Sequence, residues 1–368
     1  MSKIKIGFVG VGTISGIYLK NIRDMFAEIE VAGLCDLVKE RAENAAKEYN
    51  IAKVYKDMHE LFADPEVDIV LNITRPYEHY EVTKAALSAG KHVYTEKPLS
   101  PDLNEARELA ALAREKGLVL GGAPDTFMGA GIQTCRKLID DGFIGTPVGA
   151  SACMVTHGPE HWHPSPEFVY QYGGGPMLDM GPYYITALAN LLGKIERVTG
   201  MAKISFPQRP ILSQPKYGAV MDVDVPTYVT GVMQFAGGAV GTLFTTFDVY
   251  TDAHTRIEIY GSEGTLIVPD PNTFGGPVKL LRGAQDRFEN IPLLFEYTGN
   301  CRALGLADMA KAIQTGRTHR ANDNQLLHVV EVMDGIIKSG GSGRHIDIVS
   351  DFERESPMVS QSLKGIID

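Results

Sequence analysis

The chain has 368 residues, of which 44% are hydrophobic and 22% charged, a composition typical of a globular protein and not of a disordered one. Single domains usually stop growing at about 250–300 residues, so this length predicts two domains. The 35 basic and 45 acidic residues give a net charge of −10. Nucleic-acid and anionic-membrane binders need a basic surface, so this charge argues against both classes.

The four cysteines, Cys35, Cys135, Cys153 and Cys301, lie far apart and form no CxxC pair. They therefore predict neither a zinc site nor a redox pair, and free thiols are typical of a reducing compartment. The first residues lead directly into a strand-like run without a signal-peptide pattern, and no apolar run is long enough to span a bilayer. We expect a soluble, cytoplasmic protein.

Strand and helix patterns alternate over the first third of the chain. The expected strands are Ile6–Val9, Ile29–Cys35, Ile69–Ile73, His92–Thr95 and Val119–Leu120. The expected helices are Ile14–Phe26, Glu40–Tyr49, Tyr80–Ala89 and Leu103–Lys116. Continuous apolar strands that alternate with helices indicate a parallel sheet covered on both faces, so we predict a doubly wound α/β Rossmann domain over residues 1–123.

The pattern changes after about Pro124, where strands and hairpins become frequent. The expected strands are Val148–Thr156, Thr227–Phe235, Ala239–Phe247, Arg256–Tyr260 and Thr265–Val268. The expected helices are Ile132–Asp140, Asp179–Leu192, Cys301–Gln314 and Gln325–Ser339. Antiparallel strands with one apolar face need a cover, which these helices can supply. We predict a second, α+β domain over residues 124–368, whose last helices can pack back on the first domain.

A glycine turn follows the first strand, in the sequence Gly10-Val11-Gly12-Thr13-Ile14-Ser15. Gly10 permits a tight turn, and Gly12 lets the backbone approach a pyrophosphate at the N-terminus of the next helix. Asp36 closes the second strand at the spacing of a ribose-binding carboxylate, which favours NAD over NADP; the alternative for Asp36 is a helix N-cap. The expected cofactor contacts are Gly10, Gly12, Thr13, Ile14 and Asp36.

Thr95-Glu96-Lys97-Pro98 ends a strand at the carboxyl edge of the predicted parallel sheet, where open α/β folds bind ligands. A cis Lys97–Pro98 bond would turn the lysine inward, where its ammonium could stabilise a developing alkoxide. The alternative is a surface lysine that begins a loop.

These motifs, in their order along the chain, resemble those of the glucose–fructose oxidoreductase/inositol dehydrogenase (Gfo/Idh/MocA) family. The matching segments are Val9-Gly10-Val11-Gly12, Thr74-Arg75-Pro76 with His79, Ala89-Gly90-Lys91-His92-Val93, Glu96-Lys97-Pro98, Gly173-Gly174-Gly175 with Leu178-Asp179-Met180-Gly181, and Tyr260-Gly261-Ser262-Glu263-Gly264. The resemblance implies a Rossmann domain followed by an open mixed sheet, a nicotinamide cofactor, a sugar or polyol substrate, and a dimer or tetramer formed through that sheet.

The resemblance also implies roles for individual residues. Lys97 would be the catalytic lysine, Asp179 a carboxylate that orients the substrate, and Glu96 part of the nicotinamide pocket. Further cofactor contacts would come from Thr74, Pro76 and His79.

Tyr183 departs from the family pattern, which often has a histidine four residues after the aspartate as its general base. Asp179 and Tyr183 would share one face of a helix and so could point into one cleft. A tyrosine pKa near ~10 is high for a base, but the ammonium of Lys97 would favour the phenolate. Tyr183 is therefore expected as a base, a substrate hydrogen-bond donor, or a packed aromatic residue.

Three histidines, His157, His161 and His163, lie in a Gly- and Pro-rich loop with Trp162. Their spacing lacks the helical register of a zinc protease, so we expect no metal site. His163 remains an alternative catalytic residue, and His161 and Trp162 are candidate substrate contacts, with surface histidines and a packed tryptophan as the other interpretations.

Polar residues elsewhere receive simpler interpretations. Asp125 and Thr126 lie where the chain enters the second domain, so they could bind substrate or form a loop turn. A cluster of charge near the C-terminus, Arg317, His319 and Arg320, is expected to be solvated, and His328 to pack within the protein or at an interface.

Three functions remain open. The first is an NAD-dependent oxidoreductase that acts on a secondary alcohol of a sugar, glycoside or inositol-like polyol. The second is redox-neutral elimination or glycoside cleavage through a transient ketone, with bound NAD. The third is a non-catalytic NAD-binding sensor.

Overall fold

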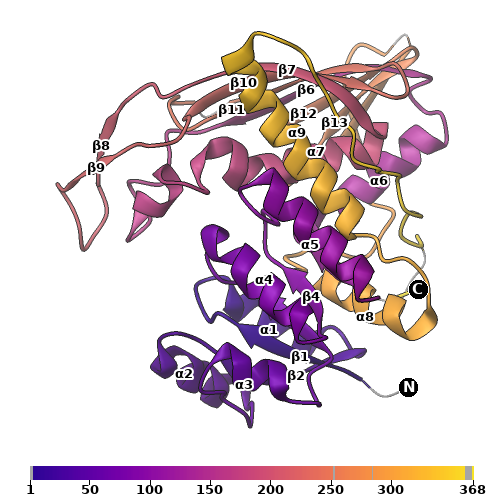
Figure 1. The fold of residues 1–368 in the computed structure, drawn as a ribbon. Coiled ribbons are helices and arrows are strands. Elements are labelled where there is room, and N and C mark those ends of the chain that lie inside the picture. Colours follow the sequence, from indigo (N-terminus) through magenta and orange to yellow (C-terminus); the bar gives the residue numbers. More distant parts are fainter. Residues whose placement is uncertain (1–2, 252, 284, 361–366) are drawn as a thin grey trace.

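The computed structural model describes residues 3–251, 253–283, 285–360 and 367–368 (Figure 1). Its first sheet is parallel throughout, in the order β2-β1-β3-β4-β5. The strands are β1 (Ile4–Val9), β2 (Ile29–Cys35), β3 (Ile69–Asn72), β4 (His92–Thr95) and β5 (Leu120–Gly122). The helices between them are α1 (Ser15–Asp24), α2 (Lys39–Tyr49), α3 (Met58–Ala63), α4 (His79–Ser88) and α5 (Leu103–Glu115). All four positions of β3 are buried, as expected for a strand covered on both faces.

The predicted doubly wound sheet is therefore confirmed, and the bounds of β2 and β4 agree with the prediction. The prediction missed the short helix α3. Its first turn is capped by the Asp57 carboxylate, which accepts the backbone N–H groups of His59 and Glu60. An aspartate followed three residues later by glutamate is a known start signal, so the sequence did contain this information.

The second sheet has nine strands in the order β15-β14-β13-β12-β6-β11-β10-β7-β16. It is mixed, because β6 and β11 run parallel and the other neighbours antiparallel. The strands are β6 (Pro147–Val155), β7 (Ile195–Lys203), β10 (Tyr228–Phe235), β11 (Val240–Thr246), β12 (Ile257–Gly261), β13 (Gly264–Val268), β14 (Val278–Arg282), β15 (Glu289–Ile291) and β16 (Ile346–Asp347). A separate hairpin joins β8 (Gln208–Pro210) to β9 (Val220–Asp222) and extends from one side of the molecule (Figure 1).

One face of the nine-stranded sheet packs on helices, and the other is open. The helices that pack on this sheet are α6 (Ala130–Asp140), α7 (Gly175–Leu192) and α9 (Asp323–Ser342), whereas α8 (Leu304–Thr315) packs on β5 of the first sheet. Along β10 buried and exposed residues alternate, with Thr230, Val232 and Gln234 exposed. This alternation explains why the hairpin formed by β10 and β11 was predictable from sequence.

The last helices contact both parts of the molecule. α9 packs along β7 and also lies against α5, where Arg107 pairs with Glu331 at 2.7 Å (Figure 1). A second ion pair between the same helices joins Arg114 and Asp323 at 2.7 Å. The domain boundary after residue 123 stays a prediction.

The predicted solvated charge near the C-terminus is wrong for His319 and Arg320, which are only 4% and 5% exposed. The carboxylate of Asp308, on α8, accepts hydrogen bonds from Arg320 Nη1 and Arg317 Nη2, each at 2.6 Å. The buried countercharge lies on another segment, so local spacing could not reveal it. His328 is fully buried and stacks on Phe352, as the packing interpretation predicted.

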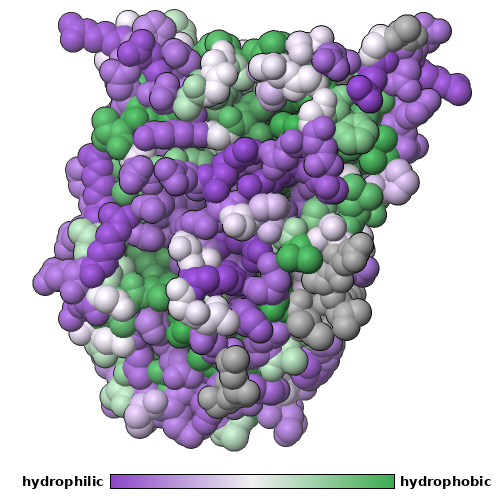
Figure 2. Space-filling model, turned by 90° about the vertical axis from the view of Figure 1, so that its right-hand side faces the viewer, coloured by the Kyte–Doolittle hydropathy of each residue, from purple (hydrophilic) through white to green (hydrophobic). Residues whose placement is uncertain are grey.

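Among the helices of the described residues, none is long and apolar enough to cross a membrane. Figure 2 shows hydrophilic residues across the middle of one side of the molecule, with smaller hydrophobic areas between them.

Candidate functional site

The glycine turn after β1 has the predicted form. Gly10 has a φ of +98°, and a Cβ there would lie 2.7 Å from the carbonyl oxygen of Ile73, so only glycine fits. At Gly12, by contrast, no atom of the described residues other than its two chain neighbours comes within 4 Å of a Cβ position. Ser15 stands at the third glycine position; it is buried, and its Oγ donates to the Gly12 carbonyl at 2.7 Å. The turn thus leaves open space at the N-terminus of α1, beside the exposed Thr13.

Asp36 links the end of β2 to this turn. Its Oδ2 accepts the N–H of Val11 at 2.6 Å, and its Oδ1 accepts the N–H of Val38 at 2.7 Å. α2 begins after Val38 and has no side-chain cap, so Asp36 is not its N-cap. Each carboxylate oxygen has a further lone pair, so the arrangement fits a ribose diol beside a pyrophosphate at Gly12.

His79 is a packing residue in this structure. Its ring is 1% exposed, with Nδ1 2.7 Å from the Pro98 carbonyl and Nε2 3.3 Å from the Thr74 carbonyl. Burial lowers its pKa, which favours the neutral ring. Both ring nitrogens face carbonyls, so the structure does not support the predicted direct cofactor contact. His79 instead holds together the loops after β3 and β4, which carry the half-buried Thr74 and Pro76.

Lys97, just after β4 of the parallel sheet, contacts Asp179, which lies on α7 beneath the nine-stranded sheet. The Lys97–Pro98 bond is cis, and Lys97 Nζ donates to Asp179 Oδ1 at 2.7 Å and to the Asp179 backbone carbonyl. The side chains are 15% and 37% exposed, respectively. Lys97 is therefore not the surface lysine of the alternative interpretation. Burial lowers the pKa of Lys97, but Asp179 and Tyr183 raise it by more, so the group stays an ammonium.

Tyr183 lies one turn after Asp179 on α7, as the spacing predicted, and is 8% exposed. Lys97 Nζ lies 5.3 Å from its ring centroid. Burial raises the pKa of Tyr183 above its usual value, although Lys97 and Arg302 oppose this shift. The expected effect of Lys97 therefore has the right sign, but burial outweighs it and Tyr183 is a neutral phenol.

Two residues that the sequence analysis did not select complete this cluster. Tyr18, on α1, donates its hydroxyl to Glu96 Oε1 at 2.7 Å, while Glu96 Oε2 accepts the N–H of Lys97 at 3.1 Å. Arg302, just before α8, is a second cation that lowers the pKa of the Tyr183 phenol, against the effect of burial. No local signal marks either residue, because each reaches the cluster from a distant segment.

Asp125 and Thr126 are each 1% exposed. The Asp125 carboxylate accepts the N–H of Gly305, in the first turn of α8, at 3.1 Å, and burial raises its pKa to about 6. The structure does not support direct substrate binding by these two residues, because their side chains are enclosed.

The histidine loop lies apart from these contacts. His161 and Trp162 are exposed, Trp162 by 64%, which contradicts plain packing under the loop. His163 Nδ1 accepts the N–H of Ser165, and its ring packs against Phe168, with centroids 5.2 Å apart. Within the described ranges, no three His, Cys, Asp or Glu side chains gather closely enough to hold a metal ion.

The glycine triplet brings this loop to the first domain. Gly173 has a φ of +87°, and a Cβ there would lie 3.2 Å from Pro101 and 3.6 Å from Pro76. The end of the histidine loop therefore approaches the segment that carries the predicted cofactor contacts.

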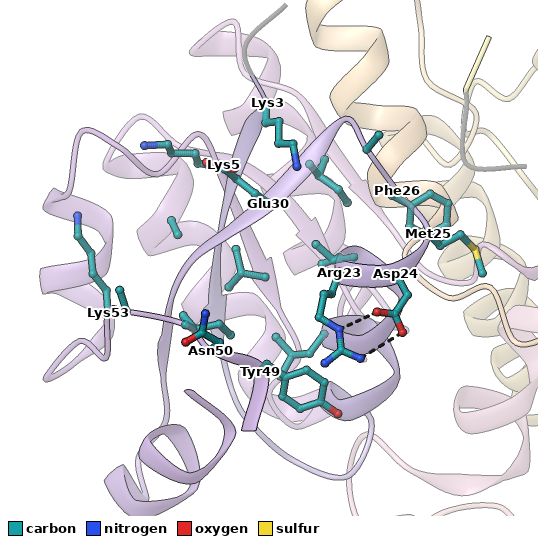
Figure 3. A pocket seen from close by; sticks show the side chains of 18 of the residues that line it. Lys3, Lys5, Arg23, Asp24, Met25, Phe26, Glu30, Tyr49, Asn50 and Lys53 are labelled. Carbon is teal, nitrogen blue, oxygen red and sulfur yellow. Dashed lines mark hydrogen bonds and ion pairs between the residues drawn. The ribbon is translucent and has the colours of Figure 1, made fainter. Parts of the chain in front are cut away.

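A cavity of about 720 Å³ lies elsewhere, beside the edge strand β2 (Figure 3). It contains none of the predicted site residues. Three of the cations that line it are paired: Arg23 with Asp24 at 2.6 Å, as Figure 3 shows, and Lys5 and Lys53 with Glu66. The cavity therefore contributes no side chain to the cluster around Lys97.

Comparisons with known proteins agree with this geometry. Residues 4–122 match the model of an oxidoreductase family with an NAD-binding Rossmann fold, and residues 132–267 match the Gfo/Idh/MocA C-terminal domain. The scyllo-inositol 2-dehydrogenase (NAD(+)) of Bacillus subtilis is 25% identical, over 96% of this chain and 98% of its own. The 1,5-anhydro-D-fructose reductase of Ensifer adhaerens is 31% identical, over 65% and 68%.

Among solved structures, an NAD-binding oxidoreductase from Klebsiella pneumoniae is similar, with a TM-score of 0.83 and 25% identity over 95% of this chain and 100% of its own. A levoglucosan dehydrogenase in complex with NADH and L-sorbose has a TM-score of 0.82 at 22% identity, covering 95% and 99%. With an NAD-binding Rossmann domain and the matching second domain, this chain belongs to the Gfo/Idh/MocA family of oxidoreductases.

Proposed function

We propose that this protein interconverts a secondary alcohol and a ketone on a sugar, glycoside or inositol-like polyol, with NAD as its cofactor. The observation that carries the proposal is the contact of the Lys97 ammonium with the Asp179 carboxylate and the Tyr183 ring, at the carboxyl edge of the parallel sheet. The relatives named for inositol and anhydrofructose support this substrate class.

The chemistry divides between cofactor and chain. When bound, the nicotinamide supplies the hydride acceptor or donor. The Lys97 ammonium donates a hydrogen bond to the reacting oxygen and stabilises negative charge that develops there. Asp179 orients Lys97 and accepts a hydrogen bond from a substrate hydroxyl group. The Tyr183 oxygen exchanges a proton with the hydroxyl group that reacts.

We assign the proton transfer to Tyr183 and not to His163, because Tyr183 adjoins Lys97 whereas the His163 ring packs on Phe168. His161 and Trp162 remain proposed substrate contacts from the loop that ends near Pro76. We further propose a dimer or tetramer formed through the open face of the nine-stranded sheet, and a cytoplasmic location.

The test is a panel of sugars, inositols and glycosides with NAD⁺, in which NADH absorbance and products are both measured. Lys97→Met is expected to lower kcat/KM about 10²–10³-fold while NAD still binds. Lys137→Met, at an exposed ion pair on α6, is the matched control and should retain activity. Product without NADH would indicate the redox-neutral reaction, and NAD binding without any turnover would indicate the sensor; either result contradicts the proposal.

A further inference from the structure

Tyr18 is a buried phenol on α1, the helix that follows the glycine turn. Its side chain is fully buried, and its hydroxyl donates to Glu96 Oε1 at 2.7 Å. Burial raises the pKa of Tyr18 well above its usual value, so the hydroxyl keeps its proton and acts as the donor. Because Glu96 directly precedes Lys97, α1 contacts the segment that carries the lysine of the candidate site.

α1 presents this hydroxyl from a fixed position. One turn after Tyr18, Asn21 is only 2% exposed and donates to the backbone carbonyls of Asn300 and Arg302, both at 2.8 Å. These two hydrogen bonds tie α1 to the segment before α8. A donor held on a packed helix can select one orientation of its acceptor.

The Glu96 carboxylate is turned to the backbone of Lys97 and not to its ammonium. Glu96 Oε2 accepts the N–H of Lys97 at 3.1 Å, and the N–H of Glu96 donates to the carbonyl of Asn72, at the end of β3, at 2.8 Å. The Lys97 ammonium pairs instead with Asp179 Oδ1 at 2.7 Å. One carboxylate therefore contacts the ammonium, and the other holds the backbone that carries it.

The Lys97 ammonium has one N–H to offer a substrate. A lysine ammonium carries three N–H donors, and two of them go to Asp179, at Oδ1 and at the backbone carbonyl. The third has no oxygen or nitrogen acceptor among the described residues, so a reacting oxygen can accept it. If the Glu96 carboxylate rotated toward the ammonium, it would take this donor, because a carboxylate accepts more strongly than a neutral oxygen.

We propose that Tyr18 is a positioning residue for Lys97. Its hydroxyl holds the Glu96 carboxylate on the Lys97 backbone and away from the ammonium, which leaves the third N–H for the oxygen of the substrate. The inference rests on the proposed function. A purely structural Tyr18 would only tie α1 to the end of β4, and the effect of its loss would then not depend on the charge of Glu96.

The first test needs no substrate. In the full chain labelled with ¹⁵N-lysine, with and without NADH, the Lys97 ammonium resonance is assigned from its loss in Lys97→Met. We expect Tyr18→Phe to shift this resonance, and to shift it much less in a Glu96→Gln background, where no carboxylate is released. The matched control is Tyr80→Phe, which removes an exposed hydrogen bond between Tyr80 and Glu108 and should leave the resonance unchanged.

An unchanged resonance in Tyr18→Phe overturns the inference, and so does an equal shift in both backgrounds. If Tyr18→Phe does not fold, Tyr18→Met fills the position without a donor and is held to the same criteria.

The second test uses a substrate found in the panel. Tyr18→Phe is expected to lower kcat about tenfold without a matching loss of NAD affinity. In a Glu96→Gln background the same substitution should lower kcat by less than about twofold. An equal loss in both backgrounds would indicate a purely structural role and overturn the inference. If no substrate is turned over, the proposed function fails, while the ammonium resonance still decides the role of Tyr18.

Discussion

Two regions of the molecule each hold a cation beside a carboxylate. One is the base of the β8–β9 hairpin, around Arg209, and the other is the junction between the two sheets, around Lys97 and Asp179. At the hairpin base, Arg209 is 3% exposed, and each of its three nitrogens donates a hydrogen bond. Nε pairs with Glu160, Nη1 with Asp248 at 2.7 Å, and Nη2 with the carbonyls of His157 and Phe247 at 3.0 and 2.9 Å. At the junction, the partner of Lys97 is 37% exposed.

This contrast separates a structural charge cluster from a reactive one. The donors of Arg209 are used within the protein, so the cluster ties the histidine loop to β8 and the end of β11. Lys97 and Asp179 keep surface that a substrate can reach, and a neutral phenol adjoins them. Accessibility and an available proton, more than burial of charge, distinguish the candidate site.

Disruption of the hairpin-base cluster should have the greatest consequence for stability. Arg209→Met leaves the buried Glu160 and Asp248 carboxylates without their cation, so we expect a loss of about 3–5 kcal/mol in the free energy of unfolding. Arg197→Met is the matched control, because its pair with Asp347 is exposed on both sides and is worth at most about 1 kcal/mol. Denaturant unfolding of the two variants measures the difference.

A purely structural cluster also requires that the Arg209→Met variant keep NAD affinity at a temperature where it is folded. Equal stabilities for the two arginine variants would show that the hairpin base is not a structural cluster. Loss of NAD binding by folded Arg209→Met would instead connect this cluster to the cofactor site.

Asp125 extends the contrast to a buried carboxylate that has no cation of its own at hydrogen-bonding distance among the described residues. It accepts the N–H of Gly305, and burial raises its pKa to about 6. Because the folded pKa lies above the unfolded value, the stability contributed by its protonated form is lost as pH rises from about 4 through 6. Asp125→Asn keeps an acceptor for Gly305 without the charge. Between about pH 4.5 and pH 8 its stability relative to wild type should therefore rise by about 2 kcal/mol.

Denaturant unfolding at the two pH values measures this difference, with the exposed Asp351→Asn as the control for loss of one negative charge. If the free energies of unfolding of Asp125→Asn and wild type change in parallel with pH, the Asp125 carboxylate is not protonated more readily in the folded state. That result would contradict the enclosed position of Asp125.

The first domain could be predicted from sequence because its signals are local. The buried run of β3, the glycine turn at Gly10 and the capping aspartate of α5 each act over a few residues. The contact between Lys97 and Asp179 was expected through the family resemblance, together with the position of Lys97 at the sheet edge.

What sequence could not supply are partners that meet only after folding. Arg320 looks like surface charge until α8 places Asp308 beside it. Tyr18 is one of many aromatic residues until α1 brings its hydroxyl to Glu96, and Arg302 depends on Asn272 and Asn21 from other segments. His79 is the opposite case, because the family resemblance marked it for the cofactor while the fold encloses its ring against the Pro98 carbonyl.

The two glycines of the turn after β1 show the same contrast, because Gly10 is enclosed and Gly12 faces open space. For Gly12 we expect the smallest change in stability of any substitution considered. Gly12→Ala adds a methyl group where no atom of the described residues, apart from its chain neighbours, lies within 4 Å, so the free energy of unfolding should change by less than about 0.5 kcal/mol. The same methyl group would occupy the space expected for the pyrophosphate, so NAD affinity should fall about tenfold, or about 1.4 kcal/mol. Gly10→Ala is the counterpart. Its Cβ would lie 2.7 Å from the Ile73 carbonyl oxygen, and alanine would have to adopt a positive φ, so we expect a loss of about 1–2 kcal/mol in stability. Calorimetric NAD titration and denaturant unfolding of both variants separate the cases. Unchanged NAD affinity in Gly12→Ala would show that the open space at this turn is not where the cofactor binds.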